Sequence, residues 1–298
     1  MPASVSCAPP ALAYSHAPGR HPAHNEGCLL HREGAAVQPR KSSMSKPLSS
    51  TQVAFFREQG YLLLKGMVPA DLRERMLAVT RDHLQRAVAP LEYEAEVGYE
   101  GAPASLEAEG GRTARRLRAA WQRDPVYREW AGSRALVAIL HQLFDEPVCI
   151  TLAHHNCVMT KHPAFGTATG WHRDIRYWSF PRNELISVWL ALGAETPENG
   201  ALKFIPGSHK LKLQPEQMDE LDFLRPDVAA NQALFAQGIA LSLEPGDVVL
   251  FHSGLFHAAG RNDSDQVKCS AVFAYHGASN PPLAGTRSAA SEDLPLED

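Results

Sequence analysis

Hydrophobic positions in the first half of the chain alternate between helix-like and strand-like spacing. Residues 50–59 follow a Ser-Ser start and carry Val53, Phe55 and Phe56 on one side, which predicts a short capped helix that ends at Gly60. The apolar run 61–64 predicts a buried strand, and residues 69–88 have the spacing of a long helix. Another helix is expected over residues 133–144.

The segment between these helices has a different pattern. Residues 92–111 carry many Glu, Gly and Ala without periodicity, which predicts a mobile loop of the kind that covers binding sites. Arg112, Arg115, Arg116 and Arg118 follow in a basic, helix-like stretch, which we interpret as the solvated face of a helix. A turn is expected at the Asp-Pro pair 124–125.

After Pro147 the pattern changes to short apolar runs separated by turn residues. Six such strands without long helices between them indicate an antiparallel barrel or sandwich. With the helices before it, the predicted fold is mainly β with flanking helices, in the α+β class. The strands are expected at residues 148–159, 185–192, 201–205, 239–243, 247–251 and 268–275.

The two ends of the chain differ in composition from its middle. Residues 1–45 are rich in Ala, Pro, His and Ser, offer little apolar surface to a core, and are expected to be a disordered extension. Translation starting at Met44 is an alternative that would remove most of it. Residues 46–276 are expected to form one domain, and residues 277–298 a flexible acidic tail.

Composition excludes some partners. A formal net charge of −4 in 298 residues leaves no basic field for nucleic acid or an anionic membrane. No apolar run approaches the roughly 20 residues that span a bilayer. The five scattered cysteines contain no CxxC pair, which is typical of a reducing compartment. We expect a cytoplasmic protein, as a monomer or a homodimer.

The candidate chemistry lies in the strand-rich half. His172 and Asp174 are two residues apart, so on an extended backbone both side chains point to one face and can reach one ion. A third ligand is available from His252 or His257, which follow the predicted strand 247–251. Two imidazoles and a carboxylate leave positions open on a metal, as non-haem iron oxygenases require, whereas structural zinc takes four protein ligands. An isolated HxD also occurs in ordinary surface turns.

Several segments in one order resemble the phytanoyl-CoA dioxygenase family of iron(II)- and 2-oxoglutarate-dependent oxygenases. They are FFREQGYLLLKG at 55–66, WHRDIRYWSF at 171–180, VWLAL at 188–192, ENGALKFIPGSHK at 198–210 and EPGDVVLFHSGLFHAAGRNDS at 244–264. The resemblance implies a double-stranded β-helix, a jelly-roll or cupin-like barrel. It also implies iron(II) held by His172, Asp174 and His257, which leaves His252 as a strand-end histidine hydrogen-bonded beside the site.

The resemblance also implies residues for the cosubstrate. Lys268 stands where the family has an arginine for the distal carboxylate of 2-oxoglutarate, and it supplies the charge without the bidentate fork. Ala259 stands where the family often has a serine. Trp189 matches a pocket-lining tryptophan, and Arg115 lies near a basic position of the family. An exposed strand-end lysine and a core tryptophan are the alternatives for Lys268 and Trp189.

The implied reaction uses dioxygen and a small-molecule or acyl-type substrate, which is hydroxylated while succinate and CO2 are released. Ascorbate is an accessory reductant in this reading, and the carboxylate of Asp174 implies oxidation without halide. Arg112, Arg116 and Arg176 are candidates to hold an anionic substrate group, or are ordinary surface arginines. Two alternatives remain: a cupin-like metal-binding protein with a non-oxidative role, and a non-catalytic family member.

Overall fold

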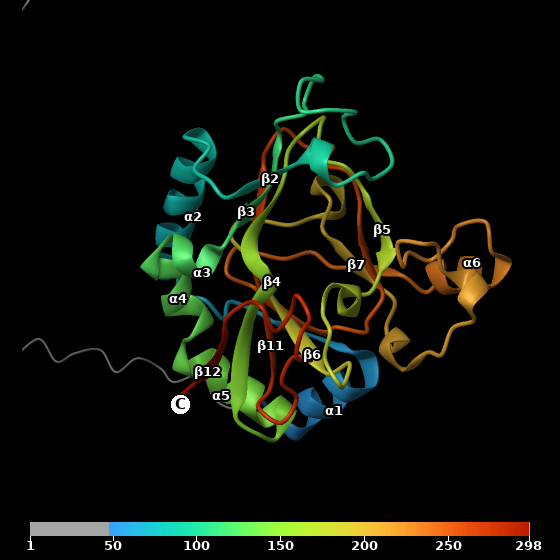
Figure 1. The fold of residues 1–298 in the computed structure, drawn as a ribbon. Helices are drawn as coiled ribbons and strands as arrows, with labels where there is room; N and C mark the ends of the chain where they lie inside the picture. The colour runs from blue at the N-terminus through green and yellow to red at the C-terminus, as the bar shows by residue number, and fades with distance from the viewer. Residues whose placement is uncertain (1–47, 298) are drawn as a thin grey trace, which may run out of the picture. The chain divides into compact units, whose positions relative to one another are not determined.

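Two antiparallel sheets make up the centre of the part of the chain that the computed structural model describes, residues 48–297 (Figure 1). The predicted disorder of residues 1–45 and the start at Met44 lie outside these residues. The larger sheet has the order β1-β9-β6-β11-β4-β3-β2, with β12 also paired to β4, and the smaller one has the order β5-β10-β7-β8. The strands are β1 (Tyr61–Leu64), β2 (Leu91–Tyr93), β3 (Ala114–Arg118), β4 (Val148–Lys161), β5 (Thr169–His172), β6 (Leu185–Ala191), β7 (Leu202–Phe204), β8 (Ile239–Ala240), β9 (Val248–His252), β10 (His257–Ala259), β11 (Lys268–Gly277) and β12 (Asp293–Leu296).

The central strands of the large sheet are buried on both faces. Every residue of β6 and β11 is buried, which agrees with their mostly apolar sequences. Along β6, Val188 and Leu190 pack into the cluster shared with the helices, whereas Trp189 and Ala191 pack with residues of the smaller sheet such as Phe204. Alternate residues thus fill two layers, and the predicted α+β jelly-roll class is confirmed.

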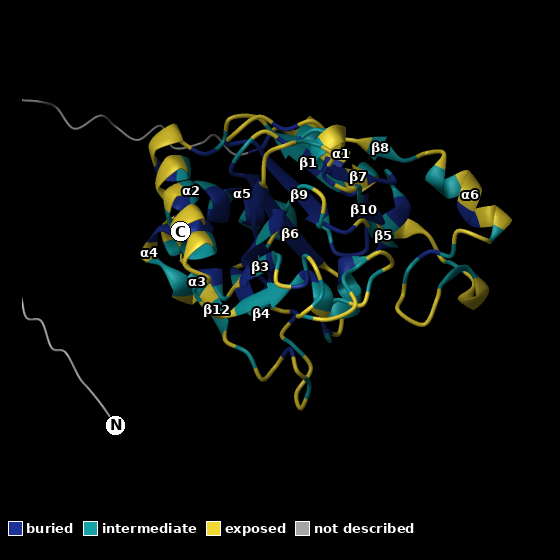
Figure 2. Ribbon diagram, turned by 90° about the horizontal axis from the view of Figure 1, so that it is seen from above, coloured by how far each residue is buried: buried dark blue, intermediate teal, exposed yellow. Residues whose placement is uncertain are grey.

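Helices cover the outer face of the large sheet (Figure 1, left). Tyr127 and Trp130 of α4 and Leu136 of α5 are buried in the same cluster as Tyr275 of β11. Figure 2 shows this layering, with dark blue strands inside and exposed turns on α1, α2 and α6. The helices are α1 (Ser50–Gln59), α2 (Ala70–Gln85), α3 (Ala120–Arg123), α4 (Pro125–Ala131), α5 (Arg134–Phe144) and α6 (Ala229–Phe235). Within residues 48–297 no helix is long and apolar enough to cross a membrane.

Capping and turn residues in the sequence predicted the first helix and the first strand correctly. The side chain of Ser49 caps α1 in a reciprocal capping box with Gln52, and Gly60 ends the helix in the left-handed conformation, with φ 78°. Strand β1 has the predicted bounds. Helix α2 ends at Gln85, before the expected residue 88, because Ala87 takes a left-handed conformation with φ 49°.

The prediction of a basic helix at residues 112–118 is wrong. Residues 114–118 form strand β3, paired with β2 and β4. Arg115 and Leu117 point inward and are buried, whereas Arg118 is exposed, so the period is two and not 3.6. Arg115 is buried because it has a buried partner from another segment, which the local pattern does not reveal. The Asp-Pro pair at 124–125 is the start of helix α4, with Asp124 as its cap.

Residues 92–111 are in part ordered structure. Residues 91–93 form β2 and Glu94–Glu96 form a 3-10 turn, and the side chain of Glu94 is fully buried. The prediction of a loop is therefore wrong for residues 92–96, and mobility of residues 97–111 stays a prediction.

The prediction of a flexible tail at residues 277–298 is wrong for its last part. Residues Asp293–Leu296 form β12, which pairs with β4 on the side away from β11. A second attachment is the ion pair between His276 Nε2 and Asp293 Oδ1, at 2.7 Å. The charges that suggested a solvated tail thus include a carboxylate that binds the barrel.

Candidate metal centre

Strand pairing brings the HxD motif and the distal histidine together. His172 is the last residue of β5, Asp174 begins the following 3-10 turn, and His257 begins β10. His257 lies directly opposite His172 in the antiparallel β5–β10 pair, and their ring centroids are 4.2 Å apart. The three side chains are buried and form a His-Asp-His group whose ligand atoms lie within 4.8 Å of one another.

Backbone carbonyls fix which nitrogen of each imidazole faces the group. His172 Nδ1 donates to the carbonyl of Gly170 at 2.9 Å, and His257 Nδ1 donates to that of Leu255 at 3.0 Å. Each Nε2 therefore faces the carboxylate, and these atoms lie 3.8 Å and 3.4 Å from Asp174 Oδ1. Both histidines thus present a metal-binding nitrogen to the same point.

The carboxylate of Asp174 is held by one oxygen only. Ser187 donates its hydroxyl to Oδ2 at 2.9 Å, and His155 Nδ1 lies 3.2 Å from that hydroxyl and 3.4 Å from Oδ2. Oδ1 is buried and has no hydrogen-bond partner among the described residues. A buried oxygen of this kind calls for a compensating cation.

The electrostatics of the group agree with that requirement. Burial, reinforced by the charge of His257, lowers the pKa of His172 well below its usual value. Burial would raise the pKa of Asp174, but His155 and His257 outweigh it and lower the pKa, so the carboxylate stays ionised. Burial also lowers the pKa of His155 to about 4. The pKa of His257, in contrast, is raised, because the neighbouring carboxylate of Asp174 outweighs the effect of burial. Two imidazoles beside an anionic carboxylate are the donor set that a divalent transition metal such as iron(II) prefers, so the residues fit the ion.

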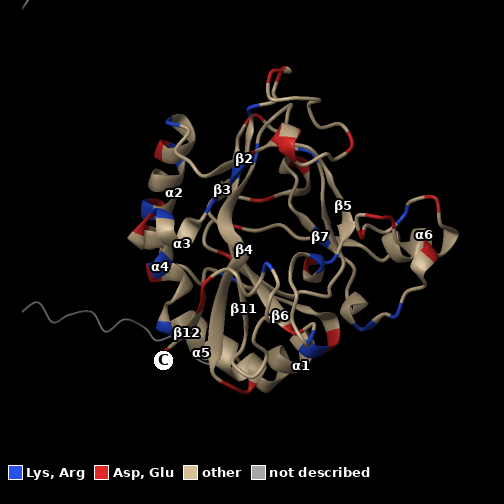
Figure 3. Cartoon of the chain, viewed as in Figure 1, with Lys and Arg blue, Asp and Glu red and all other residues tan. Residues whose placement is uncertain are grey.

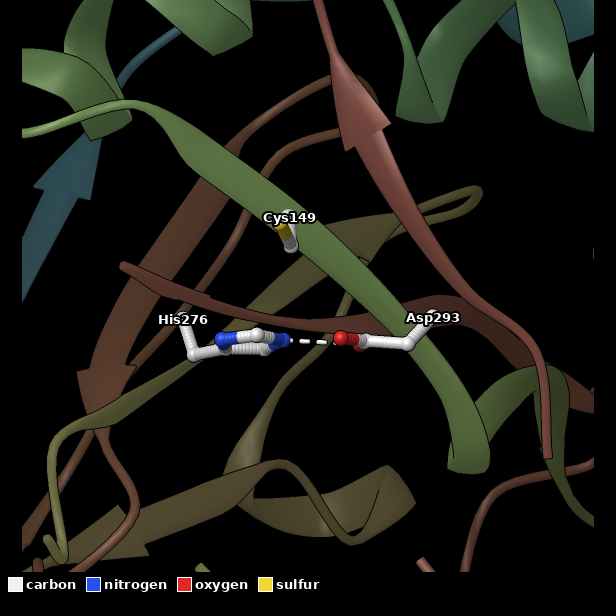
Figure 4. A group of neighbouring side chains, drawn as sticks. All are labelled: Cys149, His276 and Asp293. Carbon is white, nitrogen blue, oxygen red and sulfur yellow. Dashed lines mark hydrogen bonds and ion pairs between the residues drawn. The ribbon is translucent and has the colours of Figure 1, made fainter. Parts of the chain in front are cut away.

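A second group of three potential ligands has a structural explanation. Cys149, His276 and Asp293 lie on the adjacent strands β4, β11 and β12 (Figure 4). His276 and Asp293 are already joined by the ion pair that attaches β12. Burial raises the pKa of the Cys149 thiol, with Asp293 adding to the effect, and this disfavours the thiolate that binds metals. We assign these residues to the attachment of β12.

A pocket opens from the metal centre and contains the predicted cosubstrate residues. Lys268, Trp189 and Arg115 all line it, together with His172, Asp174 and His257. Apolar parts of its wall come from the side chains of Met159, Leu202 and Phe251, and its aromatic part from Tyr99 and Tyr177. The alternative of an exposed Lys268 is excluded, since its side chain is 4% exposed.

Arg115 is in the pocket wall, but its charge is paired. Its guanidinium donates to Glu94 Oε2 at 2.9 Å, to Thr167 Oγ1 at 2.8 Å and to Thr169 Oγ1 at 2.9 Å. The neighbouring Arg116 pairs with Glu92 at 3.0 Å, and Figure 3 shows the basic residues along β3. The two arginines therefore join β3 to the start of the 92–111 segment.

Two residues of this region were missed at the sequence level. Lys161, at the end of β4, lines the pocket, and its Nζ donates to the carbonyls of Thr167 and Gly260 at 3.0 Å and 2.6 Å. Glu195 follows β6 and is fully buried. The period of two along Cys157, Met159 and Lys161 is a signal that could have identified the lysine. Glu195 forms an isolated bridge with Leu243 in the connection after β6, where a single residue gives no periodic signal.

The other histidines lie outside the metal group. His252, the last residue of β9, accepts from the amide of Gly254 through Nδ1 and stacks near His209, with ring centroids 5.0 Å apart. His154 stacks on Tyr177 at 3.8 Å, and His162 is not part of a three-ligand cluster in residues 48–297. His155 is the exception that sequence spacing did not suggest, because it contacts Asp174.

Comparisons with known proteins agree with this geometry. The chain is 27% identical over 230 residues to a probable phytanoyl-CoA dioxygenase of Caenorhabditis elegans, covering 73% of this chain and 72% of the relative. It superposes on EctD of S. alaskensis, solved with 2-oxoglutarate and 5-hydroxyectoine, with a TM-score of 0.64 and 22% identity over 81% of this chain and 80% of EctD. The carbocyclase SnoK from nogalamycin biosynthesis gives a TM-score of 0.63 and 20% identity, over 84% of this chain and 97% of SnoK.

A family profile covers most of the domain. The profile described as Phytanoyl-CoA dioxygenase (PhyH) matches residues 56–270, from the first helix to the last central strand. This range contains the His-Asp-His group and the whole pocket around it. The chain therefore belongs to the phytanoyl-CoA dioxygenase family of iron- and 2-oxoglutarate-dependent oxygenases.

Proposed function

We propose that this protein is an oxygenase that hydroxylates a small molecule, with His172, Asp174 and His257 as the ligands of iron(II). The observation that supports this most directly is the unpartnered Asp174 Oδ1, on which two imidazole Nε2 atoms converge. Bound iron with 2-oxoglutarate supplies oxidation of a substrate C–H bond by dioxygen, with release of succinate and CO2.

The protein residues have positioning roles in this proposal. Ser187 and the two backbone carbonyls hold the three ligands before a metal arrives. Met159, Leu202 and Phe251 present apolar surface beside the ligands, which excludes water from the reacting atoms. Because Asp174 supplies a carboxylate to the metal, we expect hydroxylation or another oxidation without halide incorporation.

Lys268 is the proposed cation for the distal carboxylate of 2-oxoglutarate. It is buried in the pocket wall, at the start of β11, and its ammonium lies 5.0 Å from the centroid of the Trp189 ring. A dianion that leaves water needs such a partner. A charge-assisted hydrogen bond is worth roughly 1.5–3 kcal/mol, so Lys268→Ala should weaken cosubstrate binding about 10- to 150-fold.

Anaerobic titration tests the proposal. Iron(II) and 2-oxoglutarate are added to the protein, and the weak visible charge-transfer band of the chelate is recorded. We expect His257→Ala to abolish the band and His252→Ala, the matched control, to leave it intact. Retention of iron by His257→Ala with loss in His252→Ala would refute the ligand assignment. Iron binding without any band would favour a cupin-like metal protein with a non-oxidative role.

The substrate class is proposed as a small molecule or an acyl-type compound. A small molecule is in line with the solved EctD, which holds 5-hydroxyectoine, and with SnoK, which comes from nogalamycin biosynthesis. Ascorbate as a reductant and a cytoplasmic location stay predictions. Product analysis with oxygen-18 gas is the measurement that identifies a hydroxylated compound.

A further inference from the structure

The cation proposed for the cosubstrate already has a partner inside the protein. Lys268 Nζ lies 3.2 Å from Glu195 Oε2, and the two side chains are 4% and 0% exposed. Lys268 also donates to Ser270 Oγ at 3.4 Å. The ammonium of Lys268 can still donate a remaining N–H to a ligand in the pocket. Together with Glu195, however, it forms a pair with little net charge.

Glu195 is firmly held in this position. Its Oε1 accepts from Trp189 Nε1 at 2.9 Å and from the hydroxyl of Ser270 at 2.6 Å, while Oε2 faces Lys268. Three donors thus satisfy both oxygens of one buried carboxylate. Glu195 therefore places a carboxylate next to the place where the distal carboxylate of 2-oxoglutarate is proposed to bind.

Lys161 supplies the net positive charge that the pair of Lys268 and Glu195 lacks. It lies directly opposite Lys268 in the β4–β11 register and lines the same pocket. Its two bonded acceptors are neutral carbonyls, and no carboxylate of residues 48–297 lies within ion-pair distance of its ammonium. When Lys161 is protonated, the set of Lys161, Lys268 and Glu195 thus has a net charge of +1, enough for one carboxylate.

We propose that Glu195 determines cosubstrate selectivity, by neutralising Lys268 and so reducing the preference of the pocket for a 2-oxo dicarboxylate over a 2-oxo monocarboxylate. The inference rests on the proposed function, since it concerns the cosubstrate of that site. Two carboxylates that bind one ammonium lie about 5 Å apart, and at an effective dielectric constant of about 20 their repulsion changes an equilibrium about 300-fold. The intervening ammonium reduces this effect.

Three variants test the charges of Glu195 and Lys268 separately and together. Glu195→Gln removes the anion and should raise the preference for 2-oxoglutarate about 10- to 100-fold. Lys268→Met leaves the anion and should lower that preference by a similar factor. The double variant has the same net charge as the parent and should return to the parental preference within about threefold. Because this double variant removes both members of the buried pair and leaves neither charge without its partner, it also protects the test against misfolding of either single variant.

The experiment compares two ligands on iron-loaded protein without oxygen. Dissociation constants are measured calorimetrically for 2-oxoglutarate and for 2-oxopentanoate, which has the same chain length and no distal carboxylate. Glu292→Gln, at an exposed position, is the matched control and should leave both constants unchanged. The preference is the ratio of the two constants.

The outcomes distinguish this inference from the proposed function. If both ligands bind the parent and Glu195→Gln leaves their ratio unchanged, or weakens both equally, the role of Glu195 is refuted while the oxygenase proposal stands. If neither ligand binds the iron-loaded parent, the oxygenase proposal itself fails and the inference falls with it.

Discussion

The buried pair of Arg115 and Glu94 allows a prediction that separates a structural role from a cosubstrate role. The guanidinium and the carboxylate are 3% and 0% exposed and lie 2.9 Å apart. Arg115→Met removes the cation and leaves Glu94 with the hydroxyl of Thr167 as its nearest strong donor, at 2.6 Å. An unpaired buried charge results.

The expected loss of stability follows from the burial of the pair. Removing one partner of a buried ion pair destabilises a protein by about 3–5 kcal/mol. For a domain of this size the melting temperature should fall by roughly 6–20 °C. The double change Arg115→Met with Glu94→Gln removes both charges and should recover much of the loss.

Urea unfolding, followed by tryptophan fluorescence, measures the change in the free energy of unfolding. Arg75→Met is the control, because Arg75 pairs with Glu129 at the surface with side chains 50% and 51% exposed, and its unfolding midpoint should stay unchanged. Unaltered stability of Arg115→Met, together with loss of 2-oxoglutarate binding, would refute our reasoning. It would mean that Arg115 anchors the cosubstrate.

Three further predictions concern the ends of the domain and the pocket. A chain starting at Met44 should keep its melting temperature, and a fall of several degrees in calorimetry would show that the missing residues pack on the domain. Burial, with the charges of Lys268 and Arg115, lowers the pKa of Lys161 to about 7. Because only the protonated lysine attracts a carboxylate, 2-oxoglutarate affinity should fall as the pH rises through about 7, and Lys161→Met should abolish this calorimetric dependence. Asp293→Asn should speed hydrogen exchange in residues 293–296, and unchanged exchange would show that strand pairing alone holds β12.

Local sequence was sufficient for features whose cause is local. The cap at Ser49, the stop at Gly60 and the strand after it depend on residues within a few positions of one another. The pair His172 and Asp174 also belongs here, since two residues on an extended backbone share a face. Family resemblance added the jelly-roll class, which rests on several motifs in one order.

Tertiary structure decided which side chains meet. The choice of His257 as the histidine that meets His172 follows from the pairing of β10 with β5, whereas His252 ends β9 in the other sheet. Arg115 is inside a strand because Glu94 and two threonines, both more than fifty residues away, satisfy its charge. Neither fact has a local signature.

The pairing of Lys268 with Glu195 is the clearest example of what the chain alone did not reveal. The two residues are 73 positions apart, and each is unremarkable in its own segment. Only the adjacency of β6 and β11 brings the connection after β6 to the start of β11. Hydrophobic periodicity indicates only which face of its own helix or strand a residue occupies. The partner of a buried charge depends on how separate elements pack, and this is why the electrostatics of the pocket required the folded structure.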